Sequence, residues 1–191
     1  MDKEFWNRKY IDKINGWDIG YVSPPIKEYI DQLKDRNIKI LIPGAGSGYE
    51  AEYAFRSGFK NIFILDWAKE AISEFRKRVP EFPAGNILIE DFFGHKGKYD
   101  LVIEQTFFCS LLPEMRKQYA EKIYDLLNDK GKLAGLLFNR EFDFEGPPFG
   151  GSKEEYEIYF KGLFEFKTFE NAYNSIQPRA GKELFIIFGK K

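Results

Sequence analysis

The segment ILIPGAGSGYE, residues 40–50, indicates the fold of this 191-residue chain, together with the run FILD at residues 63–66. A short apolar run ends in a glycine-rich turn, a helix-length segment follows, and a second apolar run ends on Asp66. This order predicts two parallel strands joined by a helix, and the carboxyl ends of such strands meet at the ligand-binding edge of an open α/β sheet. Glycine at 44, 46 and 48 lets the backbone approach a ligand and adopt conformations that a Cβ would forbid. Because Asp66 offers two acceptor oxygens to adjacent ribose hydroxyls, the pattern favours a cofactor that contains adenosine.

The glycine spacing distinguishes between adenosine cofactors. Nicotinamide and flavin enzymes use G-x-G-x-x-G, in which a helix N-terminus faces the pyrophosphate. Here Tyr49 stands at the third glycine position, Gly48 comes one residue early, and Glu50 follows. A carboxylate there would repel a pyrophosphate but tolerate S-adenosylmethionine, which has no phosphate and carries an ammonium and a sulfonium. The sequence favours S-adenosylmethionine, with S-adenosylhomocysteine as product. A nicotinamide-dependent oxidoreductase and a tight turn without a ligand are the alternatives.

Composition bounds the class of protein. An apolar content of 43% in 191 residues fits one domain, 1–191, which we divide into an N-terminal lid and first helix (1–37) and a Rossmann-like core (38–191). The net charge of −1 gives no basic field for nucleic acid or an acidic membrane. No window approaches a membrane span, and Met1–Arg8 does not read as a signal peptide. One cysteine and one histidine leave no basis for a His/Cys metal site. We therefore expect a cytoplasmic protein, a monomer, that acts on a small molecule.

Periodicity and turn residues predict the elements of secondary structure. Strands are expected at 39–42, 61–66, 86–90, 99–105 and 132–139, with a turn at 128–131, and residues 164–173 and 184–190 read as a terminal hairpin. Helices are expected at 4–14, 26–36, 50–57, 69–79, 113–127 and 152–162. The alternation of strands and helices predicts an α/β fold whose mostly parallel sheet is covered on both faces.

Further residues near the predicted strand ends suit the same cofactor. Asp91 could accept a hydrogen bond from the adenine amino group, and Phe92 could stack on the ring. Glu104 and Gln105, at the end of the fourth strand, could hold the methionine end. The aromatic residues Trp6, Tyr10 and Trp17 could close over the sulfonium as a lid, because aromatic faces attract cations. His95, the single histidine, reads as a solvated loop residue.

Several motifs, taken in order, resemble those of the thiopurine S-methyltransferase superfamily, and the latter half of the chain is more similar to its halide/thiol methyltransferase branch. They are FW at 5–6, WDIG at 17–20, LIPGAGSGYE at 41–50, TFFCS at 106–110, PEMR at 113–116, EGPPF at 145–149 and PRAGKE at 178–183. The resemblance implies a class I S-adenosylmethionine-dependent methyltransferase with a central seven-stranded, mostly parallel sheet, a C-terminal antiparallel hairpin and an N-terminal helical lid. It places Trp6, Tyr10, Trp17, Gly44, Asp66, Asp91, Phe92 and Gln105 at cofactor-contacting positions, to which we add Gly46, Trp67 and Glu104.

The chain departs from the family pattern at four positions. Ala45 and Glu50 are mild changes from cysteine and aspartate. Phe138 replaces a tyrosine that the halide/thiol branch has near its substrate, and Gln105 replaces an aromatic residue. The last two changes bear on halide and thiocyanate turnover more than on cofactor binding.

The function that the resemblance implies is methyl transfer to a small thiol or a halide or thiocyanate ion by in-line displacement. Such a nucleophile is anionic and the leaving group is neutral, so no general base is required, and alignment supplies the catalysis. We expect the substrate pocket to be walled by Phe108, Phe138, Phe142, Phe149 and Tyr156, with Arg179 attracting an anionic acceptor. An N-P-P-[YF] motif is absent after the fourth strand, which disfavours base or amide methylation. Another O- or N-acceptor, or a cofactor-binding module without turnover, stays open as an alternative.

Overall fold

A seven-stranded sheet of strand order β3-β2-β1-β4-β5-β7-β6 forms the centre of the computed structural model, which describes residues 2–191. The strands are β1 (Ile40–Pro43), β2 (Ile62–Leu65), β3 (Ile87–Leu88), β4 (Tyr99–Gln105), β5 (Leu127–Phe138), β6 (Phe164–Asn171) and β7 (Glu183–Lys190). The first five strands are mutually parallel, whereas β7 runs antiparallel to both β5 and β6. The predicted fold class and the terminal hairpin are thus confirmed.

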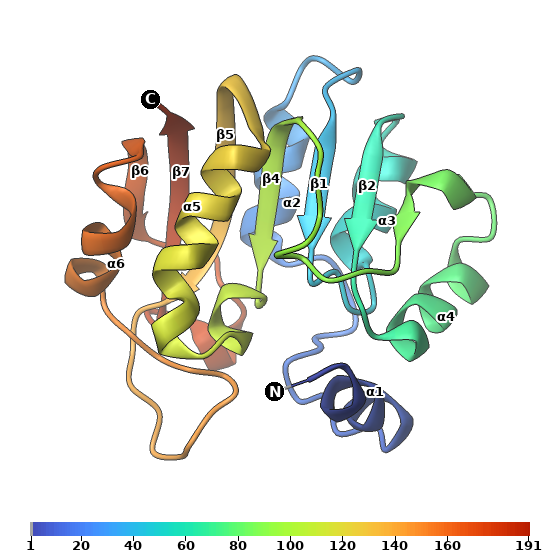
Figure 1. Ribbon diagram of the computed structural model, residues 1–191, viewed down its shortest axis with the longest axis horizontal. Helices are drawn as coiled ribbons and strands as arrows, with labels where there is room; N and C mark the ends of the chain where they lie inside the picture. The colour runs from blue at the N-terminus through green and yellow to red at the C-terminus, as the bar shows by residue number, and fades with distance from the viewer. Residues whose placement is uncertain (1) are drawn as a thin grey trace.

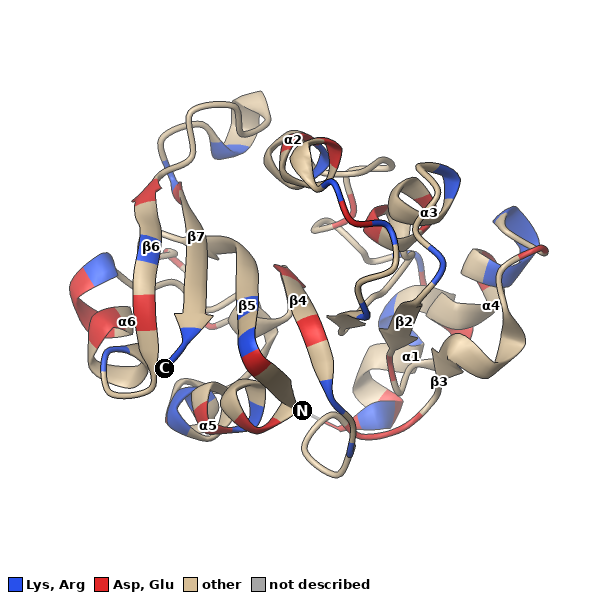
Figure 2. Cartoon of the chain, turned by 90° about the horizontal axis from the view of Figure 1, so that it is seen from above, with Lys and Arg blue, Asp and Glu red and all other residues tan. Residues whose placement is uncertain are grey.

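Helices cover both faces of the sheet (Figures 1 and 2). One face carries α2 (Pro24–Gln32), α3 (Tyr49–Arg56) and α4 (Lys69–Arg78), and the other carries α5 (Arg116–Leu126) and α6 (Lys153–Phe160). Short 3₁₀ turns lie at η1 (Ala84–Asn86), η2 (Phe108–Ser110), η3 (Pro113–Met115) and η4 (Gln177–Arg179). Lys, Arg, Asp and Glu are interspersed over these helices in Figure 2, as on an ordinary solvated surface. None of the helices described in residues 2–191 combines the length and apolar character needed to cross a bilayer.

Alternation along the strands builds two separate cores. Ile40 and Ile42 of β1 belong to the cluster formed with α2, α3 and α4, whereas Leu41 between them belongs to the cluster formed with α5 and α6. Successive side chains of a strand point to opposite faces, so a parallel strand buried on both faces is apolar throughout. This explains why the run ILIP reads as a continuous apolar segment.

Helix α1 (Lys3–Ile11) covers neither face of the sheet, and lies beyond the carboxyl ends of the parallel strands (Figure 1). It begins at Asp2, whose side chain accepts a 2.9 Å hydrogen bond from the Phe5 amide as an N-cap. None of its residues is fully buried, because it packs over a cavity instead of a core. The predicted helix at 4–14 is therefore present but shorter.

The largest difference from the predicted elements concerns β5. The predicted turn at 128–131 lies within this strand, at a point where its pairing with β4 shifts from Tyr99 opposite Leu127 to Leu101 opposite Lys132. Lys130 has a φ of 63°, so the extra residues form an irregularity in the ladder. Residues 128–131 thus interrupt the regular pairing, as turn residues do, but β5 continues on both sides of them because it pairs with β4 there.

Candidate cofactor and acceptor site

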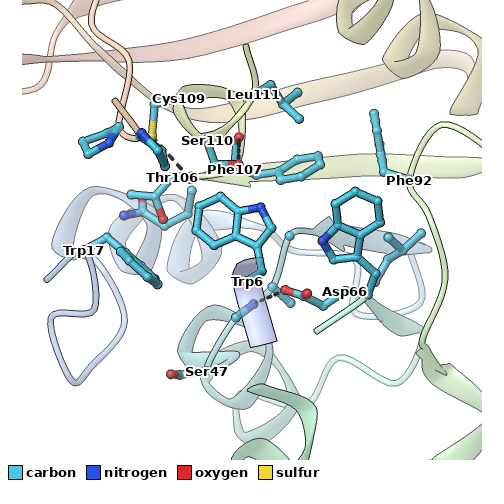
Figure 3. A pocket seen from close by; sticks show the side chains of 18 of the residues that line it. Trp6, Trp17, Ser47, Asp66, Phe92, Thr106, Phe107, Cys109, Ser110 and Leu111 are labelled. Carbon is cyan, nitrogen blue, oxygen red and sulfur yellow. Dashed lines mark hydrogen bonds between the residues drawn. The ribbon is translucent and has the colours of Figure 1, made fainter. Parts of the chain in front are cut away.

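A cavity of about 500 Å³ lies at the carboxyl ends of the parallel strands (Figure 3). Helix α1, which lies beyond these strand ends in Figure 1, covers it. Four segments supply its walls: the glycine turn after β1, the ends of β2 and β3, the turn after β4, and the N-terminal segment that includes α1. Pro147 and Pro148, from the loop after β5, complete it. The edge of the sheet at which the sequence predicts a cofactor therefore holds a cavity.

The glycine turn needs glycine at three positions. Gly44, Gly46 and Gly48 have φ values of 57°, 53° and 69°, in the left-handed region that residues with a Cβ rarely adopt. Space excludes a side chain as well. A Cβ on Gly44 would lie 2.2 Å from Cδ2 of Phe107, and one on Gly46 would lie 2.6 Å from the Tyr10 hydroxyl. The turn is thus closely covered by Phe107 and by α1.

Asp66 follows β2 and faces the glycine turn. One carboxylate oxygen accepts a 2.9 Å hydrogen bond from the Gly46 amide (dashed in Figure 3), and the other accepts a 2.8 Å bond from the Ala68 amide. The residue is 8% exposed, and burial raises the pKa of its carboxyl. Each oxygen of a carboxylate can accept a second hydrogen bond. Asp66 therefore fixes the turn and still has acceptor capacity on the cavity side.

Aromatic residues of the N-terminal segment close the cavity. The rings of Trp6 and Tyr10 both contact Trp17 edge to face, with centroids 5.6 Å and 5.9 Å apart. In the view of Figure 3, the Trp6 indole lies between Asp66 and the turn after β4. Burial, and then the charge of Asp66, raise the pKa of Tyr10, which stays a neutral phenol. All three predicted lid residues line the cavity.

Two contacts anchor the segment that carries Trp17. Asp18 accepts hydrogen bonds from the Ser47 hydroxyl in the glycine turn and from the Gly20 amide. Arg179 donates from Nη2 to the Trp17 carbonyl at 2.7 Å, while its Nη1 lies 3.5 Å from Glu183. Arg179 does not line the cavity. The predicted role of Arg179 as an attractor of an anionic acceptor does not fit this placement. Its guanidinium charge is paired with Glu183, and its Nη2 donates to the backbone carbonyl of Trp17.

The segment after β3, which was predicted to contact the adenine of the cofactor, forms one wall of the cavity. Asp91 and Phe92 both line the cavity, but Phe92 is only 3% exposed because it packs on Phe107 and stacks on Tyr119. Asp91 uses one oxygen to accept a 2.9 Å hydrogen bond from the Gly94 amide. Trp67, at the end of β2, also lines the cavity.

His95 is buried, contrary to the expectation of a solvated loop residue. Its Nδ1 lies 2.5 Å from an oxygen of Glu90 and its Nε2 lies 2.8 Å from the Tyr99 hydroxyl. These two partners satisfy both ring nitrogens, which makes burial possible. Glu90 lines the cavity, so the histidine supports its wall from behind.

Glu104 and Gln105, at the end of β4, were both predicted to contact the cofactor, but they lie in different surroundings. Gln105 lines the cavity, and its Oε1 is buried without a hydrogen-bond partner among the described residues. Glu104 is fully buried and does not line the cavity. Adjacent strand residues face opposite sides, so only one of the pair could reach the ligand. The predicted contact between Glu104 and the cofactor does not fit this placement, and strand alternation is the signal that could have excluded it.

The acceptor end differs from the predicted pocket. None of the expected wall residues lines the cavity: Phe108, Phe138, Phe142, Phe149 and Tyr156. Phe108 and Tyr156 are core residues, with 1% exposure each, and Phe138 packs on Phe142 in the loop after β5. The size and apolar character of Phe108 and Tyr156 favour the core, whereas Phe138, Phe142 and Phe149 are half-buried outside the cavity. In this region the cavity is lined by Phe107, Cys109, Ser110, Leu111, Leu112, Met115, Pro147 and Pro148. Most of these residues lie in the motifs TFFCS, PEMR and EGPPF. The family motifs therefore indicated these segments, but not which of their residues line the cavity.

Comparison with known proteins decides the family. The family described as Thiopurine S-methyltransferase (TPMT) matches residues 1–187. This chain belongs to the thiopurine S-methyltransferase family. It is 30% identical over 184 residues to the probable thiol methyltransferase 2 of Arabidopsis thaliana, covering 93% of this chain and 81% of the relative. It is 29% identical to thiocyanate methyltransferase 1 of Brassica oleracea over the same shares. The chain is therefore an S-adenosylmethionine-dependent methyltransferase.

Solved structures agree with this family on the fold. The Burkholderia thailandensis 1,6-didemethyltoxoflavin-N1-methyltransferase, solved with S-adenosylhomocysteine, matches with a TM-score of 0.81 at 15% identity and covers 99% of this chain and 87% of that one. The Synechocystis magnesium protoporphyrin IX methyltransferase, solved with S-adenosylmethionine, has a TM-score of 0.74 at 13% identity, with coverage of 100% and 98%. The class I methyltransferase fold predicted from the sequence is thus confirmed.

The cavity of this thiopurine S-methyltransferase family member fits a cationic cofactor. Its charged lining residues in the described range 2–191 are all carboxylates, with no Lys, Arg or His among them: Asp18, Glu50, Asp66, Glu90 and Asp91. The unpartnered Oε1 of Gln105 is a free acceptor suited to an ammonium or hydroxyl donor. Gly44, Gly46 and Gly48 all line the cavity, so backbone without side chains forms this part of its wall. These negatively charged and hydrogen-bond-accepting groups suit the cationic S-adenosylmethionine better than a pyrophosphate.

We expect Arg179→Met to loosen the lid of this methyltransferase without unfolding it. The substitution removes the bond to the Trp17 carbonyl and the pairing with Glu183, but keeps an unbranched side chain of similar length. The dissociation constant of S-adenosylhomocysteine, measured by calorimetry, should rise about threefold to tenfold, near 1 kcal/mol. Amide hydrogen exchange of residues 3–20 should accelerate. Arg56→Met, at a half-exposed arginine that pairs with Glu52 on α3, is the control and should leave both measurements unchanged. Unchanged exchange in Arg179→Met would contradict the anchoring role.

Proposed function

We propose that this methyltransferase moves the methyl group of S-adenosylmethionine to the sulfur of a small apolar thiol that carries no fixed charge. The observation that carries the proposal is the acceptor end of the cavity, where Leu111, Leu112, Met115 and the Pro147–Pro148 pair provide an apolar wall. No lysine, arginine or histidine of residues 2–191 lines the cavity to pair with a carboxylate or phosphate on the acceptor. The thiol methyltransferase of Arabidopsis thaliana among its relatives supports sulfur as the accepting atom.

We assign the cofactor contacts to the lining residues that the sequence already indicated. They are Trp6, Tyr10, Trp17, Gly44, Gly46, Asp66, Trp67, Asp91, Phe92 and Gln105. Asp66 would accept from the ribose hydroxyls, and Asp91 from the adenine amino group. Gln105, with its unpartnered oxygen, would accept from the ammonium of the methionine end. Trp6 and Trp17 would exclude water above the sulfonium.

The bound cofactor supplies an electrophilic methyl group on a positively charged sulfur. The chain's own contribution is alignment and exclusion of water. The glycine turn and Asp66 hold one reactant, and the apolar wall after β4 holds the other against it. Fixing two reactants in line supplies effective molarities of roughly 10⁵ M or more. A thiolate needs no general base, and none of the cavity residues is arranged as a nucleophile with its base.

The proposal is tested by methyl transfer from labelled S-adenosylmethionine to a panel of acceptors. We expect kcat/KM for thiophenol to exceed that for 2-carboxythiophenol at least about tenfold, because the carboxylate adds a second anion that no cation of the cavity pairs. It should also exceed that for iodide and thiocyanate, which have no apolar ring to bury against Leu111, Leu112 and Met115. The double variant Trp6→Ala/Asp66→Ala provides the blank. A preference for thiocyanate, iodide or the carboxylated thiol would overturn the proposed substrate class. Product from an amine or alcohol alone would favour the O- or N-acceptor alternative, and tight cofactor binding without any product would favour a binding module.

A gain-of-function variant sharpens the same test. Gln118 of α5 lines the cavity and is exposed at its mouth. We expect Gln118→Lys to raise the ratio of kcat/KM for 2-carboxythiophenol over thiophenol about threefold to tenfold, because a partly exposed ion pair contributes up to about 1 kcal/mol. Gln118→Met is the matched control of similar length and no charge. An equal ratio in both variants would mean that acceptors bind elsewhere.

We further propose that the enzyme works in the cytoplasm as a monomer, without nucleic acid or membrane as partner. The buried free thiol of Cys109 and the interspersed surface charges of Figure 2 support this setting.

A further inference from the structure

The turn that follows β4 connects the two halves of the cavity. Thr106 and Phe107 line it next to Gln105 on the cofactor side, and Cys109 and Ser110 continue it on the acceptor side (Figure 3). The Phe107 ring also lies directly against Gly44, because a Cβ there would fall within 2.2–2.7 Å of three of its side-chain atoms. Any movement of this turn therefore changes the glycine turn and the acceptor wall together.

The turn has an unfavourable backbone conformation. Thr106 has a φ of 59°, in the left-handed region that β-branched residues avoid most strongly. Such a conformation costs about 1–3 kcal/mol and persists only where the surroundings fix it. Something in the structure must therefore hold the backbone after β4.

Glu104 supplies the contacts that hold it. One carboxylate oxygen accepts hydrogen bonds from the amides of Phe107 and Phe108, at 2.7 Å and 2.8 Å. The other oxygen accepts a 2.5 Å bond from the Tyr119 hydroxyl on α5. The residue has 0% exposure, so no water can replace these bonds. A buried carboxylate with three donors is a rigid clamp between the turn and α5.

We propose that Glu104 is a positioning residue for methyl transfer, whose carboxylate holds the Thr106–Phe108 turn in the conformation that places cofactor and acceptor in line. It acts from behind the cavity, through the two amides, and touches neither reactant. Its effect on the acceptor side rests on the proposed function, whereas its effect on the turn and on cofactor binding does not.

The ionisation of Glu104 gives the clamp a measurable signature. Burial raises the pKa of this carboxyl to about 7, well above the ordinary value for glutamic acid. The Tyr119 hydroxyl on α5 and the Cys109 thiol on η2 face it, and both have raised pKa values, so they stay neutral while it titrates. Because burial opposes ionisation, the folded protein is most stable with Glu104 protonated, and this stability is lost as pH rises through about 7, while the hydrogen bonds from Phe107, Phe108 and Tyr119 still hold the carboxylate. Wild-type protein should therefore lose Tm between pH 5 and 8.5 relative to Glu104→Gln, which cannot ionise.

The decisive experiment compares Glu104→Leu, which removes both acceptors, with Glu104→Gln, whose amide oxygen can still accept from the two backbone donors. We expect Glu104→Leu to lower kcat on the order of 100-fold, the cost of a misplacement of about 1 Å. Glu104→Gln should recover most of that loss. Hydrogen exchange of the Phe107 and Phe108 amides should accelerate only in Glu104→Leu, and the dissociation constant of S-adenosylhomocysteine should rise with it.

A control on the same strand separates positioning from general destabilisation. Asp100, near the opposite end of β4, also accepts a backbone bond, 2.8 Å from the Lys39 amide. Asp100→Asn should lower Tm without changing kcat or the exchange of the two amides. Should Glu104→Leu not fold, Glu104→Asp replaces it, because a carboxylate withdrawn by one methylene cannot reach both amides. Wild-type kcat and amide protection in either variant, or an equal loss of kcat in Asp100→Asn, would overturn the proposal. Failure of the thiol panel would leave the exchange and cofactor measurements intact, so the two results can be told apart.

Discussion

Gly44→Ala is expected to weaken cofactor binding on the order of 100-fold, which corresponds to about 2.8 kcal/mol. Two physical effects combine. The φ of 57° at this position disfavours any residue with a Cβ by about 1–2 kcal/mol. The added Cβ would also lie 2.2 Å from Cδ2 and 2.5 Å from Cγ of the Phe107 ring, so the turn after β4 must move. Calorimetry with S-adenosylhomocysteine and the Tm of the free protein measure the two consequences separately.

Gly58→Ala is the matched control for this substitution. Gly58 follows α3 and has a φ of 92°, but nothing lies within 4 Å of the position that a Cβ would occupy. The variant should therefore show the backbone cost alone, a loss of stability of about 1 kcal/mol, with cofactor affinity unchanged. If Gly44→Ala bound the cofactor as tightly as Gly58→Ala, the close contact between the glycine turn and Phe107 would have no part in the site.

Asp66→Ala is expected to raise the dissociation constant of S-adenosylmethionine roughly 10-fold to 100-fold. Hydrogen bonds to a charged acceptor contribute about 1.5–3 kcal/mol, and the substitution also leaves the Gly46 amide without its 2.9 Å partner. The glycine turn then loses its support from β2 at the same time as the cofactor loses an acceptor. Calorimetry at pH 7.5 gives the affinity directly.

Asp66→Asn separates these two contributions. An asparagine keeps one acceptor oxygen for the backbone but has no charge, so its affinity for the cofactor should fall between those of wild type and Asp66→Ala. The NH2 group of the asparagine then faces the other of the two backbone amides, those of Gly46 and Ala68, so Asp66→Asn should be less stable than wild type. Equal affinity in wild type and Asp66→Ala would refute the assignment of this carboxylate to the ribose.

Both predictions concern residues that could be found from sequence. Gly44, Gly46 and Asp66 follow from local rules, because a left-handed turn demands glycine and a strand-terminal carboxylate in a parallel sheet lies at the ligand edge. The order of strands and helices gave the fold class for the same reason, since hydrophobic periodicity is a property of each segment alone. The aromatic residues Trp6, Tyr10 and Trp17, which precede the first strand, were also expected at this site, and all three line the cavity.

Local patterns therefore predicted the strands of the sheet, the glycine turn and the class of cofactor, because each depends on residues near one another in the chain. The residues that line the rest of the cavity, and the partners of the charged side chains, are known only from the packed molecule. Phe108 and Tyr156 went into the core and Arg179 turned to the Trp17 carbonyl, because their partners come from segments far away in sequence. Glu104 faces α5 while Gln105 faces the cavity, a difference that follows from which face of β4 each side chain occupies. Burial and pairing are properties of the packed molecule, so a residue's type alone could not fix its role.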